Sequence, residues 1–99
     1  MRKNIYIKMA EMIVAFRVMP VDGEVEYSDL ESAIKGVVEA YAEGTTKVLK
    51  IESEPAGFGM EACAFEIQLD ETYGCEPLEN ELDALEVTGT VAVTKMDRL

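Results

Sequence analysis

One segment near the start of the chain, residues 12–19, is almost continuously apolar and rich in branched side chains. Pro20 follows it directly and interrupts the run. A run of this length and composition predicts a strand that is covered on at least one face and lies centrally in a sheet. A second strong strand pattern covers residues 62–69, where apolar side chains occupy every second position from Cys63 to Leu69.

The segments around these two strands predict the remaining elements. Apolar residues recur at helical spacing from Leu30 to Tyr41, which indicates one amphipathic helix. Ser28 followed by Glu31 predicts a capping box at its start, and Gly44 is expected to end it. Two further strands and a second helix complete the chain: a lysine-bearing edge strand over residues 47–52, a helix over residues 77–85 and a final strand over residues 87–96.

The predicted order is strand, helix, strand, strand, helix, strand. Two split strand–helix–strand units in this order form the ferredoxin-like βαββαβ sandwich, an α+β fold in which two helices cover one face of a four-stranded antiparallel sheet. Right-handed crossovers place the first and third strands in the middle, and these are the two most apolar ones. We assign residues 9–99 to this one domain and regard residues 1–8 as an N-terminal extension, either non-native or from an upstream start.

The composition excludes several classes of partner and of chemistry. The chain has 9 basic and 20 acidic residues, a net charge of −11 and no histidine. This charge disfavours direct contact with nucleic acid or anionic membranes and favours a basic partner, although solubility alone also explains it. The lack of histidine removes the commonest general base and the usual zinc chemistry. Cys63 and Cys75 show no metal-ligand spacing and no dense disulfide framework, so we expect a cytoplasmic protein. We also expect that it is not an enzyme and that it uses no metal and no cofactor.

A short glycine-rich segment is unusual for a purely structural role. Gly57, Phe58, Gly59 and Met60 place an aromatic side chain between two glycines at the tip of a predicted hairpin. A tight turn explains the glycines but not the large apolar residue between them. Phe58 either folds back onto the sheet or anchors a partner, as exposed aromatic residues do in interfaces.

The C-terminus is the second unusual segment. Lys95 and Arg98 place two of the nine basic residues within the last five positions of an acidic chain, next to Met96 and Leu99. One interpretation is a frayed tail whose charge aids solubility. The other is a partner-binding end.

These two segments resemble the translation elongation factor 1-beta family. The stretch from Ser53 to Met60 is similar to its Pro-x-Ala/Gly-Phe-Gly-apolar loop, and the stretch from Met96 to Leu99 is similar to its apolar, polar, basic, apolar terminus. The resemblance covers roughly residues 9–99, at the size of the short archaeal form. It implies a guanine-nucleotide exchange factor, monomeric when free, that promotes GDP release and GTP loading on elongation factor 1-alpha during translation elongation.

The resemblance also implies roles for single residues. Phe58 would pack on one domain of the GTPase, and Arg98 would approach the magnesium and phosphate region of its nucleotide domain. Eukaryotic members carry lysine where Arg98 stands, so Lys95 is an alternative cation. The hairpin and the terminus follow strands that run in opposite directions, which places them at opposite ends of the sheet, roughly 25 Å apart.

A different class of function stays open at this point. The same fold serves regulatory or scaffolding domains that bind a small ligand or pair through a sheet edge. Such a domain would show no dependence on a GTPase.

Overall fold

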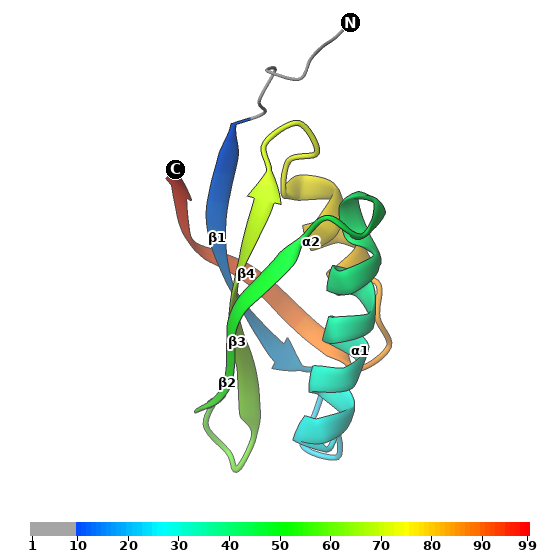
Figure 1. Cartoon of the computed structure of the whole chain (residues 1–99). Helices are drawn as coiled ribbons and strands as arrows, with labels where there is room; N and C mark the ends of the chain where they lie inside the picture. Colours follow the sequence, from blue (N-terminus) through cyan, green and yellow to red (C-terminus); the bar gives the residue numbers. More distant parts are fainter. Residues whose placement is uncertain (1–9) are drawn as a thin grey trace, which may run out of the picture.

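The computed structural model describes residues 10–99, so the predicted extension over residues 1–8 lies outside the described residues. Within them, one antiparallel sheet has the strand order β2-β3-β1-β4, and α1 and α2 cover one of its faces (Figure 1). The elements are β1 (Glu11–Pro20), α1 (Tyr27–Ala40), the short 3-10 helix η2 (Tyr41–Gly44), β2 (Lys47–Pro55), β3 (Glu61–Asp70), α2 (Glu76–Asp83) and β4 (Thr88–Arg98). The predicted ferredoxin-like fold is confirmed, with the first and third strands in the centre.

The core lies between the sheet and the helices. Phe16 in β1 pairs with Phe65 in β3, and their rings stack with centroids 5.1 Å apart. Helical spacing presents three side chains of α1 and two of α2 to this layer, and each is at most 1% exposed: Leu30, Ile34, Val38, Leu78 and Leu82. The same periodicity that predicts the helices therefore forms the core. We call the sheet face opposite α1 and α2 the open face.

The start of α1 differs from the prediction. The helix begins at Tyr27 with Glu26 as its N-cap, and no side chain caps it, so the capping box of Ser28 and Glu31 does not form. Two backbone amides of the first turn instead donate to the Glu26 carbonyl, at 3.0 and 3.1 Å. The Tyr27 hydroxyl contacts Cys63 Sγ in β3 at 3.6 Å, so the helix is already packed on the sheet before Ser28 is reached.

The end of α1 is also earlier than expected. The helix ends at Ala40, and η2 follows it. Ala42, Glu43 and Gly44 then have φ values of 56°, 58° and 84°, so three successive residues adopt the left-handed conformation. We call this segment turn 42–44. Gly44 ends the turn rather than the helix, because the chain must reverse direction here to enter β2.

The strand β4 is longer than predicted and contains an irregularity. Phe16 pairs with Val93 but Ala15 pairs with Lys95, so Thr94 is an extra residue that forms a β-bulge. Its hydroxyl donates to the Ala15 carbonyl at 3.3 Å. The strand continues to Arg98, and the next backbone amide still donates to the Glu11 carbonyl at 2.9 Å. The interpretation of the C-terminus as a frayed tail is therefore wrong.

Candidate functional site

The tip of the β2–β3 hairpin is a tight turn of left-handed residues, which we call turn 57–59. The backbone amide of Met60 donates to the Gly57 carbonyl at 2.9 Å and closes it. Gly57, Phe58 and Gly59 have φ values of 87°, 53° and 76°. Positive φ at both central residues, Phe58 and Gly59, is typical of a type I′ hairpin turn. Glycine adopts this conformation freely, whereas phenylalanine does so at a cost of about 1–2 kcal/mol.

The side chain of Phe58 is 99% exposed. The interpretation in which it folds back onto the sheet is therefore wrong. Among the described residues the ring gains no burial that would offset its strained backbone. Strain that does not serve packing is characteristic of functional sites.

The surface beside turn 57–59 is hollow rather than flat. Met60 is half-buried at the base of the turn, on the side of the loop between β1 and α1. A shallow depression of about 400 Å³ lies here, lined by Ser53, Pro55, Gly57, Gly59, Met60 and Glu61. The apex therefore combines a protruding aromatic ring with an adjoining recess, a shape suited to interlocking with another protein.

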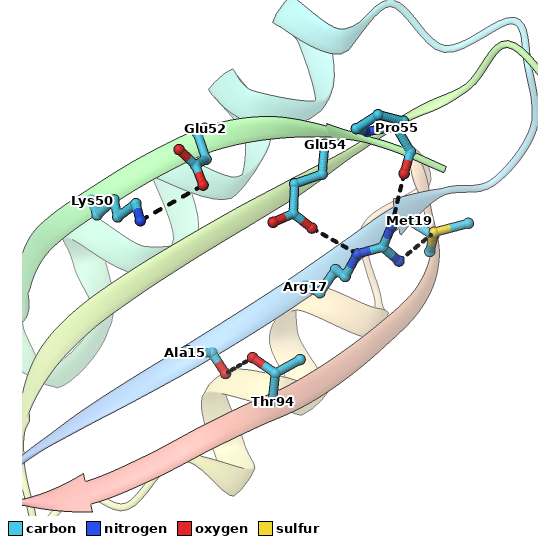
Figure 2. A network of polar contacts seen from close by, with 8 residues as sticks. All are labelled: Ala15, Arg17, Met19, Lys50, Glu52, Glu54, Pro55 and Thr94. Carbon is cyan, nitrogen blue, oxygen red and sulfur yellow. Dashed lines mark hydrogen bonds and ion pairs between the residues drawn. The ribbon is translucent and has the colours of Figure 1, made fainter. Parts of the chain in front are cut away.

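Arg17 is a residue of this region that the sequence analysis missed. It lies in β1 on the open face, and its Nε donates to Glu54 Oε1 at 3.0 Å (Figure 2). Its Nη2 donates to the Pro55 carbonyl at 3.1 Å, and its Nη1 contacts Met19 Sδ at 3.2 Å. The available signal was that Arg17 is the single charged residue in the apolar segment 12–19.

The C-terminal end of β4 carries the two predicted cations on opposite faces of the sheet. Arg98 pairs with Met12, a core-facing position, and its guanidinium forms an ion pair with the Glu71 carboxylate. Lys95 pairs with Ala15 on the open face, and its Nζ lies 3.5 Å from Asp97 Oδ2.

Two apolar side chains accompany these cations at the end of β4. Met96 is 51% exposed and Leu99 is 69% exposed. The predicted residues of this segment are therefore all accessible, but Lys95 and Arg98 are not brought together.

The hairpin tip and the end of β4 lie at opposite ends of the sheet (Figure 1). In this view the hairpin is at the bottom and the C-terminus is at the top. The predicted arrangement at two separate ends is thus confirmed. The eight predicted residues form two surfaces and not one pocket.

Neither Cys63 nor Cys75, the two cysteines of the chain, is an activated nucleophile. Burial raises the pKa of the Cys63 thiol and of the Cys75 thiol, so both stay protonated near neutral pH. In residues 10–99, no group of three or more histidine, cysteine, aspartate or glutamate residues could hold a metal ion. Across the same range, no helix is both long and apolar enough to cross a membrane.

Comparison with known proteins adds independent information. The family described as the EF-1 guanine nucleotide exchange domain matches residues 13–99. Elongation factor 1-beta of Methanosphaera stadtmanae is 34% identical over 92 residues, which cover 92% of this chain and 99% of that protein. Elongation factor 1-beta of Methanothermobacter thermautotrophicus is 33% identical over 92 residues, with the same coverage of 92% and 99%.

A solved structure supports the fold alone. The ACT domain from the GTP pyrophosphokinase of Chlorobium tepidum superimposes with a TM-score of 0.61 at 20% sequence identity. The match covers 90% of this chain and 99% of that domain. At this level of identity the likeness concerns the arrangement of strands and helices and not the function.

Proposed function

The chain belongs to the family of EF-1 guanine nucleotide exchange domains, and from this premise we propose that it contacts its GTPase at both ends of the sheet. The function of the family is guanine-nucleotide exchange on elongation factor 1-alpha in translation elongation. In our proposal turn 57–59 contacts one domain of the GTPase, and the end of β4 contacts the nucleotide-binding domain.

The observation that carries this proposal is the state of Phe58. Its ring is 99% exposed on a backbone with φ of 53°, so the residue contributes strain and no burial to the free chain. Burial of such a ring in a partner supplies the contact area that hot-spot residues provide. Gly57, Gly59 and Met60 then act as the turn and its base, which hold the ring away from the sheet.

The second contact involves the charged end of β4. Arg98 has a side chain that is 76% exposed and can leave Glu71 without unfolding any element. In the proposed complex its guanidinium approaches the magnesium and phosphate site, where a cation competes with Mg²⁺ and disturbs the contacts that hold GDP. Met96 and Leu99 supply apolar contact beside it. Lys95, on the other face of β4, is the less favoured cation in this arrangement.

Exchange of this kind requires no covalent step. The protein binds the nucleotide-free GTPase more tightly than the GDP-bound form, and this difference in affinity accelerates release. The net charge of −11 steers association with a basic surface, most strongly at low salt. We place the protein in the cytoplasm, as a monomer when free, with no cofactor and no direct contact with nucleic acid or membrane.

The test is release of a fluorescent GDP analogue from the cognate elongation factor 1-alpha. Catalytic amounts of the chain should accelerate release, Phe58→Ala should abolish most of the acceleration, and deletion of Arg98 and Leu99 should weaken it. Lys95→Met serves as the matched control and should retain most activity. Full activity in Phe58→Ala together with strong loss in Lys95→Met would refute the proposed contacts.

A further inference from the structure

Arg17 occupies a position from which it connects the centre of the sheet to the base of the hairpin. It is the one basic residue of β1, and it pairs with Ala64 of β3. Its partners Glu54 and Pro55 belong to β2, which lies on the far side of β3. Adjacent strands are about 4.8 Å apart, so the side chain spans a whole strand to reach them.

The intervening strand is shaped to allow this reach. Ala64 faces Arg17, and Ala62 faces Glu54, so β3 presents only methyl groups below the guanidinium. Ala62 is fully buried although it lies on the open face, which agrees with side chains lying across it. Figure 2 shows the guanidinium of Arg17 with its contacts to Glu54, Pro55 and Met19.

The contact with Pro55 adds a hydrogen bond at a position where the hairpin ladder provides none. The Ala56 amide donates to the Met60 carbonyl, so the neighbouring pair of Pro55 and Glu61 is a non-hydrogen-bonded pair of the antiparallel ladder. Arg17 Nη2 donates to the Pro55 carbonyl at 3.1 Å, immediately before the residues that enter turn 57–59. Its Nε also donates to Glu54 at 3.0 Å, so the two hydrogen bonds together fix the orientation of the guanidinium.

We propose that Arg17 is a positioning residue that holds the direction of turn 57–59 and thereby presents Phe58 to the GTPase. The inference rests on the proposed function, in which Phe58 is an anchor. Arg17 acts through the hairpin, because each of its three guanidinium nitrogen atoms already contacts Glu54, Met19 or Pro55. Its influence should therefore depend on the presence of the Phe58 ring.

A double-mutant cycle tests this dependence. Arg17→Met keeps the apolar stem and removes the donors, and it should lower kcat/KM for GDP release by about tenfold, mainly by raising KM for the GTPase. In the Phe58→Ala background the same change should cost less than about twofold, because coupled residues are not additive. An equal loss in both backgrounds, or no loss in the unsubstituted background, overturns the proposal.

A second measurement is independent of the GTPase. The backbone amides of Ala56 and Met60 donate within the hairpin, each at 2.9 Å, and hydrogen exchange reports their opening. Both should exchange faster in Arg17→Met, and unchanged rates overturn the proposal. Lys50→Met is the matched control, since Lys50 pairs with Glu52 at 3.7 Å on the same face and its removal should leave both amides unchanged. If the unsubstituted chain fails to accelerate GDP release from the GTPase, the proposed function is refuted. The hydrogen-exchange measurement still decides whether Arg17 holds the hairpin.

Discussion

Two left-handed turns stand at the two ends of β2, and they are supported very differently. Turn 42–44 has φ values of 56°, 58° and 84°, and turn 57–59 has values of 87°, 53° and 76°. In the first, two non-glycine residues are left-handed: Ala42, which is 6% exposed and belongs to the core, and Glu43, which is exposed. In the second, the non-glycine residue Phe58 is 99% exposed. Similar backbone strain therefore serves packing at one end and accessibility at the other.

The polar contacts around turn 42–44 strengthen this contrast. Thr45 Oγ1 donates to the Ala42 carbonyl at 2.7 Å, and the Tyr41 hydroxyl donates to the Gly74 carbonyl at 2.9 Å. Turn 57–59 has its two backbone hydrogen bonds and the Arg17 network at its base, but its apex makes no side-chain packing within residues 10–99. A strained turn that the fold supports indicates a structural role, whereas a strained and bare apex indicates a role in binding.

The largest expected effect concerns turn 42–44. Ala42→Val places a β-branched side chain at positive φ in a buried position, which combines backbone strain with overpacking. We expect the free energy of unfolding to fall by about 3 kcal/mol, as measured by urea denaturation. The variant protein that remains folded should still accelerate GDP release from elongation factor 1-alpha as strongly as the unsubstituted chain does. A loss of exchange activity without a loss of stability would contradict the purely structural role of turn 42–44.

Phe58→Asn should produce the opposite pattern. Asparagine tolerates the left-handed conformation, and Asn-Gly is the preferred pair for a type I′ turn. The fold should gain about 0.5–1 kcal/mol of stability, while kcat/KM for GDP release falls by about 30-fold through loss of the ring. Thermal denaturation and the exchange assay measure the two effects on one sample. Equal or lower stability would show that the ring supports the fold after all.

Tyr41→Phe should have the smallest effect. It also tests, through the pH dependence of stability, whether the Tyr41 hydroxyl supports turn 42–44. Removal of the hydroxyl leaves the carbonyls of Tyr73 and Gly74 without this donor and should cost about 1 kcal/mol of stability, with exchange unchanged. Burial, assisted by the charge of Glu81, raises the pKa of Tyr41 above its ordinary value of 10.0. The stability that depends on the protonated hydroxyl is therefore complete below pH 10 and decreases as the pH rises further.

Urea titrations between pH 8 and pH 11 would check this dependence. Stability should decline less steeply in Tyr41→Phe than in the unsubstituted chain, because the variant has no hydroxyl to ionise at this position. Identical slopes would contradict the assignment of Tyr41 as a support of turn 42–44.

Much of the fold was predictable because its elements have strong periodicity. The apolar run at 12–19 and the alternation at 62–69 identify the two central strands, and the spacing from Leu30 onward identifies α1. The capping box was wrong because the contact between Tyr27 and Cys63 joins residues 36 positions apart. A local motif cannot represent such a contact, and tertiary packing decided where the helix begins.

The sequence predicted that the candidate residues lie at two ends of the sheet, and their contacts with a partner stay a prediction, but it did not predict the face of the sheet on which each cation lies. A period of two continued from Val91 and Val93 would place Lys95 on the core-facing side of β4. The bulge at Thr94 reverses this alternation, so that Lys95 lies on the open face and Arg98 on the other. Arg17 was missed for a related reason, because its role depends on Ala62 and Ala64, which are neighbours only in the folded sheet.

In the proposed contact with the GTPase, the placement of turn 57–59 and the end of β4 at opposite ends of one sheet makes strand length a determinant of binding. Each residue adds about 3.3 Å to a strand, so an insertion of two residues along the sheet would separate the two surfaces by a further ~6.6 Å. In the proposed complex, a GTPase whose two contacted domains keep a fixed spacing would not accommodate such a change. We therefore expect the lengths of β2, β3 and β4 to be matched to the distance between two domains of elongation factor 1-alpha, so that a change in one protein requires a compensating change in the other.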